Sequence, residues 1–214
     1  MRAAALIFDL DGTLSDPAVG ISRSLNYALN AFGYRSLSAL EVSRYVGPPL
    51  DWAFGQIVPD ASTAQILALV AKYRERYRDV GYKENVLYPG IADALARLSA
   101  DGVQMGVCTS KRTDFAEQIL EMFRLRQHFS FVHGGDVGVA KGDQLRALLE
   151  QGMVRPTSTM IGDRAVDIEA ARANGLGAVG VLWGHGTKAE LLAATPDGLL
   201  ESPSELAGLR GGRS

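Results

Sequence analysis

The chain has 214 residues, of which 47% are hydrophobic and 21% are charged, a composition typical of a globular protein with one domain or a domain plus a smaller module. Its 22 basic and 24 acidic residues give a net charge of −2, which argues against a nucleic-acid partner because such surfaces carry a basic excess. Cys108 is the single cysteine, so no intramolecular disulfide can form, and we expect a reducing, cytoplasmic setting. The apolar run before Asp9 is too short for a signal peptide or a membrane span, so we expect no membrane partner.

Short apolar segments alternate with helical patterns along most of the chain. Residues 3–10 are almost continuously apolar up to the first aspartate, which is typical of a strand buried on both faces. Further strand candidates are residues 103–109, 130–132, 159–161, 178–182 and, with a weaker pattern, 198–200. The alternation predicts an α/β fold with a Rossmann-like, mainly parallel sheet and helices on both faces.

The helical patterns lie between these strand candidates. Ile91, Leu95 and Leu98 recur at helical spacing, and similar patterns occupy residues 115–122 and 145–149. A further helix is predicted over residues 166–173, and the Asn-Gly pair after it is typical of a helix C-terminus.

One segment interrupts the alternation. Between residues 17 and 85 we find no convincing strand, but we find several amphipathic stretches, the longest over residues 62–80. The breakers GPPL and VPD separate these stretches. We therefore expect an all-helical cap of residues 16–86, inserted into an α/β core formed by residues 1–15 and 87–214.

Polar side chains follow the ends of the predicted strands. They are Asp9, Asp11, Thr109, Ser110, Lys111, Lys141, Asp163 and Asp167. Ligands bind at the carboxyl ends of the strands in an open parallel sheet, so these groups should converge. Four carboxylates near one point need a cation, and hard oxygen ligands select Mg²⁺, for which Asp9 and Asp163 are candidate ligands. A lysine and a hydroxyl beside them suit a phosphoryl group, which indicates phosphoryl transfer, with an aspartate as a candidate nucleophile.

These residues also carry a resemblance to a known family. FDLDGTLSD, VCTSK, Lys141 and IGDRAVDIEAARANG resemble, in this order, the four motifs of the haloacid dehalogenase superfamily. The resemblance covers nearly the whole chain, and the helical insert is similar to the C1 cap of that superfamily. YVGPPL, YPG and the segment GVLWGHGTKAELLAATPDGLL are similar to its phosphoglycolate phosphatase-like branch. The resemblance implies a Mg²⁺-dependent phosphatase that hydrolyses a small phosphorylated metabolite through an aspartyl-phosphate.

The resemblance also implies a role for each acidic residue. Asp9 would attack phosphorus, and Asp11 would act as general acid and then as general base, with its backbone carbonyl on Mg²⁺. Asp163 would bind the metal directly. Lys141 would balance the charge of nucleophile and phosphate, and Asp167 would help through water or by orienting Lys141.

The phosphate-binding residues are predicted with less specific signals. Thr109 and Ser110 would hydrogen-bond the phosphate, together with backbone N–H groups at Gly12 and Thr13. A threonine at a strand end can instead cap the following helix. Two further features depart from a simple match: Gly142 follows Lys141 where many family members have proline, and Lys111 is a rival for the role of that lysine.

Several alternatives share the same scaffold. A dehalogenase needs no acid two positions after its nucleophile, so Asp11 argues against it. A phosphonatase would need a cap lysine, and neither Lys72 nor Lys83 has a suggestive context. A sugar phosphomutase of the β-phosphoglucomutase type, a nucleotide 5′-phosphatase and a non-catalytic binding protein remain open. His185 could reach the rim of the site, but we expect it to have a loop role instead, and we expect Cys108 to be a core residue.

Overall fold

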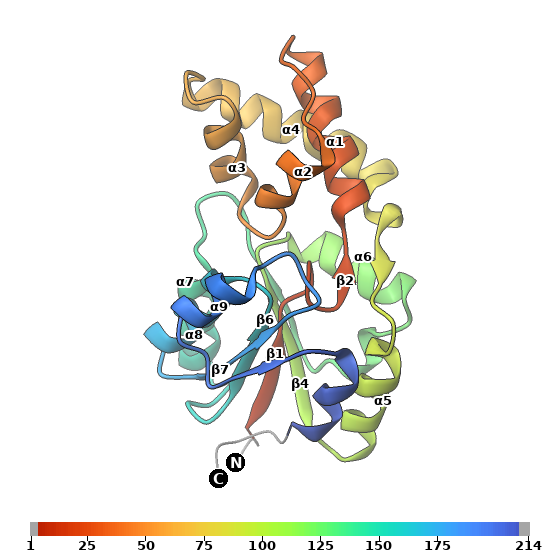
Figure 1. The fold of residues 1–214 in the computed structure, drawn as a ribbon, viewed down its shortest axis with the longest axis vertical. Helices are drawn as coiled ribbons and strands as arrows, with labels where there is room; N and C mark the ends of the chain where they lie inside the picture. The colour runs from red at the N-terminus through yellow and green to blue at the C-terminus, as the bar shows by residue number, and fades with distance from the viewer. Residues whose placement is uncertain (1–3, 210–214) are drawn as a thin grey trace.

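The computed structural model describes residues 4–209 and has a parallel sheet at its centre (Figure 1). Its strand order is β5-β4-β1-β6-β7-β8, and every neighbouring pair in this sheet is parallel. The strands are β1 (Ala5–Phe8), β4 (Gln104–Thr109), β5 (Val132–Gly134), β6 (Thr159–Gly162), β7 (Gly177–Val181) and β8 (Gly198–Leu200). The predicted α/β fold with a mainly parallel sheet is therefore confirmed.

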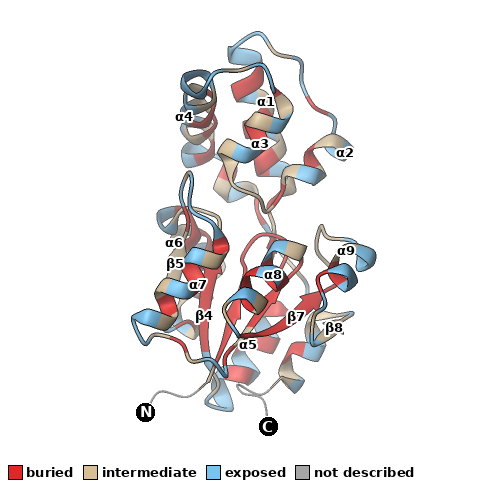
Figure 2. Cartoon of the chain, turned by 90° about the vertical axis from the view of Figure 1, so that its left-hand side faces the viewer, coloured by how far each residue is buried: buried red, intermediate tan, exposed pale blue. Residues whose placement is uncertain are grey.

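The sheet is covered on both faces, as the apolar sequence of β1 predicts. Leu6 and Phe8 point into one hydrophobic cluster, and Ala5 and Ile7 point into another. The first cluster is closed by α5 (Ile91–Ala100), α6 (Thr113–Met122) and the 3-10 helix Pro203–Gly208. The second is closed by α7 (Lys141–Glu150), α8 (Ala165–Ala173) and α9 (Lys188–Ala193). Figure 2 shows the buried strands between these layers.

A helical unit follows the first strand. It comprises α1 (Ala18–Ala31), α2 (Ala39–Val42), α3 (Leu50–Ile57), α4 (Thr63–Asp79) and the 3-10 helices Ser43–Tyr45 and Gly81–Glu84. These helices lie together at one end of the molecule (Figure 1) and pack around a third hydrophobic cluster, which includes Leu25, Phe54 and Leu69. Phe115 of α6 also belongs to this cluster, so the helical unit packs directly on the α/β part.

Two short strands join the helical unit to the α/β part. β2 (Ser15–Asp16) leads into it, β3 (Val86–Leu87) leads back, and the two pair in antiparallel orientation. The sequence does not predict these two strands, because two residues are too few to show an alternating pattern. Their position at both junctions agrees with the expected insertion, while the domain boundaries at residues 16 and 86 stay a prediction.

Several strand ends differ from the prediction by one or two residues, and β1, for example, ends at Phe8 rather than at residue 10. β1 begins at Ala5, and the predicted start at residue 3 lies outside the described residues. β5 lies two residues later than the predicted 130–132, although its pairing with β4 begins earlier. Ser130 N donates to the Met105 carbonyl at 2.8 Å, and Val107 N donates to the Phe131 carbonyl at 3.0 Å. The apolar signal at Phe131 therefore marks real sheet pairing just before the regular strand.

No helix within residues 4–209 is both long and apolar enough to span a membrane.

Candidate active site

Asp9 and Lys141 form the centre of the site at the carboxyl end of β1. Asp9 directly follows the strand, and its backbone N–H donates to the Ile161 carbonyl of β6 at 2.9 Å, which holds it at the sheet edge. Lys141 is the first residue of α7, and its Nζ lies 2.8 Å from Asp9 Oδ2. The same ammonium bonds Asp167 of α8. The predicted orientation of Lys141 by Asp167 thus has a direct contact in the structure.

Asp163 lies beside this pair, just after β6. Its Oδ2 accepts the backbone N–H of His185 at 2.8 Å, and its Oδ1 accepts the hydroxyl of Thr13 at 3.2 Å. Gly12 makes this close approach feasible, because a Cβ on Gly12 would lie 2.2 Å from Asp163 Oδ2. Gly12 also has a φ of +80°, a conformation that glycine adopts without steric cost.

Three carboxylates of the described residues could hold one cation. Asp9, Asp163 and Asp167 are buried, and one oxygen of each lies within 4.8 Å of the other two. Lys141 is the ammonium bonded to this group, so three carboxylates and one ammonium leave two negative charges. A divalent cation balances that excess, and carboxylate oxygens are the ligands that Mg²⁺ prefers. The donor set therefore fits the predicted metal.

Burial and charge repulsion shift the pKa values of these groups. Burial, followed by the charges of Asp167 and Asp9, raises the pKa of Asp163 to about 8. Burial also raises the pKa of Asp167 to about 6, although Lys141 partly offsets this. Burial lowers the pKa of Lys141, but the charges of Asp167 and Asp9 more than compensate, so the net shift is upward and the lysine stays charged.

Asp11 is paired with Lys111 and not with Lys141. Its Oδ2 lies 2.8 Å from Lys111 Nζ, whereas its buried Oδ1 has no hydrogen-bond partner among the described residues. Burial raises the pKa of the Asp11 carboxyl, and the charge of Lys111 works against that shift. The structure thus separates the two candidate lysines, since Lys141 contacts Asp9 and Lys111 contacts Asp11.

The predicted phosphate-binding residues lie at the same sheet edge. Thr109 is buried at the end of β4, and its Oγ1 accepts the backbone N–H of Lys111 at 3.3 Å. It does not cap α6, whose N-cap is Arg112. Gly12 N donates to the Ser15 carbonyl at 2.8 Å, and the Thr13 hydroxyl is bonded to Asp163. Phosphate binding by these groups and by Ser110 stays a prediction.

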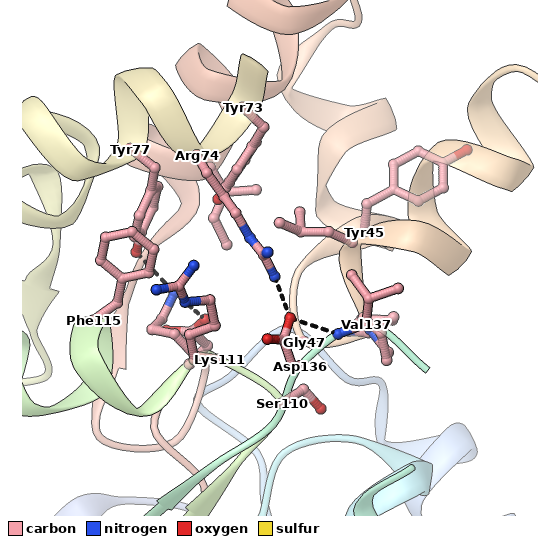
Figure 3. Close-up of a pocket in the computed structure, with 16 residues that line it drawn as sticks. Tyr45, Gly47, Tyr73, Arg74, Tyr77, Ser110, Lys111, Phe115, Asp136 and Val137 are labelled. Atoms are coloured by element: carbon pink, nitrogen blue, oxygen red, sulfur yellow. Dashed lines mark hydrogen bonds and ion pairs between the residues drawn. The ribbon is translucent and has the colours of Figure 1, made fainter. Parts of the chain in front are cut away.

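A pocket adjoins Asp11 between the helical unit and the sheet edge (Figure 3). Its lining comes from α4, from the loop before α3, and from the segments after β4 and β5. The lining includes Tyr45, Pro48, Pro49, Tyr73, Arg74, Tyr77, Ser110, Lys111, Arg112, Phe115 and Asp136. Arg74 Nη2 lies 2.5 Å from Asp136 Oδ1, an ion pair that connects α4 with the loop after β5. The pocket is thus aromatic and carries charges of both signs.

Residues that connect the helical unit with the core are not apparent from the sequence. Tyr77 of α4 accepts a hydrogen bond from Lys111 Nζ at 2.8 Å, but in the sequence it is one more apolar position of a helix. Arg164 donates to the Val46 carbonyl at 2.8 Å and pairs with Glu190. A sequence pattern cannot show such contacts, because they join segments that are distant along the chain.

His185 lies in the loop after β7, as expected, but it also contacts the site, whereas Cys108 is a core residue as predicted. The His185 backbone bonds Asp163, and its Nε2 lies 3.2 Å from Asp16 Oδ1 at the start of the helical unit. Cys108 is buried within β4, and burial raises the pKa of its thiol to about 12, which makes it a poor nucleophile.

Comparison with known proteins places this geometry in a family. The model of the haloacid dehalogenase-like hydrolases matches residues 6–181. A 5′-nucleotidase of Pseudomonas aeruginosa is 37% identical in a 205-residue alignment that covers 92% of each chain. A phosphoglycolate phosphatase of Synechococcus elongatus is 33% identical and 94% of each chain is covered. A protein of Mycobacterium tuberculosis named tyrosine-protein kinase PtkA is 36% identical, but the match spans 62% of that protein.

Solved structures agree with the fold. The crystal structure of a predicted phosphatase from Clostridium acetobutylicum has a TM-score of 0.91 and 33% sequence identity, and 97% of this chain and 98% of that chain are covered. The chain therefore belongs to the haloacid dehalogenase-like hydrolase family, as its motifs indicate, and its enzyme class is that of the family's phosphatases.

Proposed function

We propose that the protein is a Mg²⁺-dependent phosphatase that hydrolyses a small phosphate monoester through an aspartyl-phosphate on Asp9. The observation that carries this proposal is the position of Lys141, whose ammonium contacts both Asp9 and Asp167 within a buried group of three carboxylates. A carboxylate held beside a fixed positive charge can attack an anionic phosphoryl group, because the lysine offsets the repulsion between them.

Asp9 is the nucleophile in this mechanism. Its carboxylate oxygen forms a bond to phosphorus while the bond from phosphorus to the leaving oxygen breaks, in line with the attack. Water then attacks the same phosphorus, the bond to Asp9 breaks, and inorganic phosphate leaves. The backbone contact of Asp9 with β6 supports this role, because it fixes the carboxylate at the edge where substrate would bind.

Asp11 moves the protons. It donates a proton to the leaving oxygen in the first step and removes one from the attacking water in the second. Two observations support this assignment. Burial raises the pKa of the Asp11 carboxyl, although the charge of Lys111 works against that shift, and its Oδ1 is not engaged by another described residue.

Asp9 and Asp163 would hold Mg²⁺ through their carboxylates, with the backbone carbonyl of Asp11 as a further protein ligand. Asp167 lies close enough to contribute an oxygen directly or through water. When bound, Mg²⁺ offsets the negative charge of the phosphoryl group and of the carboxylates. Thr13 and the backbone of His185 orient Asp163 for this task, since they bond its two oxygens.

The helical unit acts in this proposal as a cap of residues 16–86. Its contacts with the core through Arg74, Tyr77 and the Val46 carbonyl close it over the pocket. Opening would admit substrate and water, and closing would shield the first step. The hinges would lie at residues 15–17 and 85–89, where β2 and β3 join the two parts.

The leaving group would occupy the pocket beside Asp11. We propose an activity like that of phosphoglycolate phosphatases, with nucleotide 5′-phosphatase as the second candidate. The second is favoured by the aromatic lining, in which half-buried Tyr45 offers a ring that suits a planar base, while the rings of Tyr73, Tyr77 and Phe115 pack against one another. The relative named 5′-nucleotidase supports the same candidate.

The proposal is tested with Asp9→Asn and a generic aryl phosphate, p-nitrophenyl phosphate. We expect Mg²⁺-dependent turnover by the unmodified protein, which EDTA abolishes. Asp9→Asn should lower kcat by roughly 10⁴-fold or more, because the covalent route disappears while the side-chain volume is kept. Asp60→Asn, on the exposed loop between α3 and α4, is the matched control and should leave kcat unchanged. Normal turnover by Asp9→Asn would overturn the assignment of the nucleophile.

A panel of metabolite phosphates then separates the two candidate substrates. The value of kcat/KM is compared for phosphoglycolate, nucleoside 5′-monophosphates and a sugar phosphate. Preference for the nucleotides would support the second candidate. Absence of turnover with every ester at every Mg²⁺ concentration would favour a binding protein on the same fold.

A further inference from the structure

Lys111 connects Asp11 with the helical unit through buried polar contacts. Its Nζ lies 2.8 Å from Asp11 Oδ2 and donates to the Tyr77 hydroxyl at 2.8 Å (Figure 3 shows the contact with Tyr77). Asn85 Nδ2 donates to the same hydroxyl at 3.4 Å, and the Ser15 hydroxyl donates to Asn85 Oδ1 at 3.0 Å. These five residues form a continuous chain of contacts, which we call the Asp11–Ser15 relay.

Every member of the relay is shielded from solvent. Tyr77 and Ser15 are 1% and 0% exposed, Asn85 is 6% exposed, and the side chains of Lys111 and Asp11 are 7% and 9% exposed. A buried charge or hydroxyl is costly unless it keeps its partner, so each contact restrains the next one. The Tyr77 hydroxyl and the Asp11 carboxylate therefore both hold the Lys111 ammonium in its position.

The relay members come from three parts of the fold. Asp11 and Lys111 follow the core strands β1 and β4, Tyr77 lies on α4 of the helical unit, and Ser15 and Asn85 lie in or beside the two connecting strands. The Lys111–Tyr77 bond therefore exists only while the helical unit packs against the core. Asp11 is the one relay member to which the proposed mechanism gives a chemical task.

We propose that Tyr77 and Lys111 are positioning residues for Asp11, so that docking of the helical unit aligns the general acid with the leaving oxygen. The inference rests on the proposed function and adds two residues that act through Asp11. Lys111 holds Oδ2 and leaves Oδ1 unengaged among the described residues, and Tyr77 holds Lys111 from the side of the helical unit.

Misplacing a general acid has a recognisable kinetic effect. An alkyl oxygen leaves poorly unless it is protonated, whereas p-nitrophenolate is a stable anion that leaves without help. The value of kcat/KM reports the first step, in which the leaving group departs, and is independent of the later hydrolysis of the aspartyl-phosphate. Loss of positioning should therefore lower kcat/KM for alkyl esters and spare that for the aryl ester.

Tyr77→Phe tests the proposal, because it removes only the hydroxyl and keeps the ring that stacks on Tyr73 and packs against Phe115. The substrates are p-nitrophenyl phosphate and an alkyl ester, either phosphoglycolate or AMP, whichever the unmodified protein hydrolyses faster. We expect kcat/KM to fall about tenfold for the alkyl ester and less than about twofold for the aryl ester; tenfold corresponds to about 1.4 kcal/mol. Tyr27→Phe is the matched control, because the Tyr27 hydroxyl bonds Glu75 of α4 and has no contact with the relay. This substitution should change neither value.

A double-mutant cycle shows whether Tyr77 acts through Lys111. Lys111→Met should produce the same selective loss, and adding Tyr77→Phe to it should lower kcat/KM no further. Equal losses for both esters, unchanged kcat/KM for both, or additive losses in the double mutant would overturn the inference and leave the proposed function standing. If the unmodified protein hydrolyses neither ester with Mg²⁺, the proposed function fails and the inference fails with it.

Discussion

Lys141 Nζ lies 2.8 Å from Asp9 Oδ2, and both side chains are almost fully buried, with 1% and 3% of their surfaces exposed. Removing either partner of so deeply buried an ion pair would leave an unpaired charge away from solvent, which is strongly unfavourable. In this protein the pair joins the end of β1 to the start of α7, so the same contact serves the fold and the proposed reaction.

Removal of this lysine should affect both stability and activity. Lys141→Met leaves Asp9 and Asp167 without their ammonium partner, so we expect the free energy of unfolding in EDTA to fall by about 3–5 kcal/mol. Turnover should be lost even where Mg²⁺ restores the fold. Urea denaturation and p-nitrophenyl phosphate hydrolysis measure the two effects. Lys188→Met, at an exposed position of α9, should shift stability by no more than about 0.5 kcal/mol. Equal effects of both substitutions would show that the buried pair has no special role.

Stability and Mg²⁺ binding should depend on pH in opposite directions. The pKa values of Asp163 and Asp167, about 8 and about 6, exceed the ordinary value of 3.8, so the folded metal-free protein binds protons that the unfolded chain releases. The stabilisation that comes from protonated Asp163 and Asp167 is complete below about pH 4 and is lost as the pH rises through 6 and 8. Mg²⁺ needs the deprotonated carboxylates, so its binding tightens over the same range.

Urea denaturation at pH 5 and pH 8, with EDTA or with Mg²⁺, measures this dependence. We expect a smaller free energy of unfolding at pH 8 in EDTA and a larger stabilisation by Mg²⁺ at pH 8 than at pH 5. Asp163→Asn removes the group with the larger shift and should weaken both trends. A metal-free protein that becomes more stable between pH 5 and pH 8 would contradict the shifts.

We expect that Gly12 tolerates no side chain. Gly33 is a control that separates the cost of the backbone conformation from the cost of the close contact with Asp163. Gly12 and Gly33 have φ values of +80° and +78°, so Gly→Ala at either position carries a backbone cost of about 1–2 kcal/mol. A Cβ at Gly12 would also lie 2.2 Å from Asp163 Oδ2, whereas one at Gly33 meets no described atom within 4 Å. We expect Gly12→Ala to lose stability beyond the Gly33→Ala value and to lose activity and Mg²⁺ affinity. Denaturation, calorimetric Mg²⁺ titration and kcat measure these effects, and similar results for both variants would count against the close approach.

Much of the fold could be predicted from local patterns. The apolar runs of β1 and β4 and the helical periodicity of α5 and α6 are visible in the sequence, because burial on a sheet or helix face imposes a fixed spacing of apolar residues. The two-residue strands β2 and β3 were missed, since pairing across the junction forms them and no repeating pattern marks them.

The candidate site shows the same division between local and long-range information. The sequence by itself determined which acids and lysines follow the strands, since the carboxyl ends of parallel strands lie at one edge. Only the tertiary structure decided that Lys141 contacts Asp9, that Lys111 contacts Asp11, and that Tyr77 reaches Lys111 from the helical unit. These pairings depend on how separate elements pack, because a hydrogen bond forms at about 3 Å and spacing along the chain does not fix distances between elements.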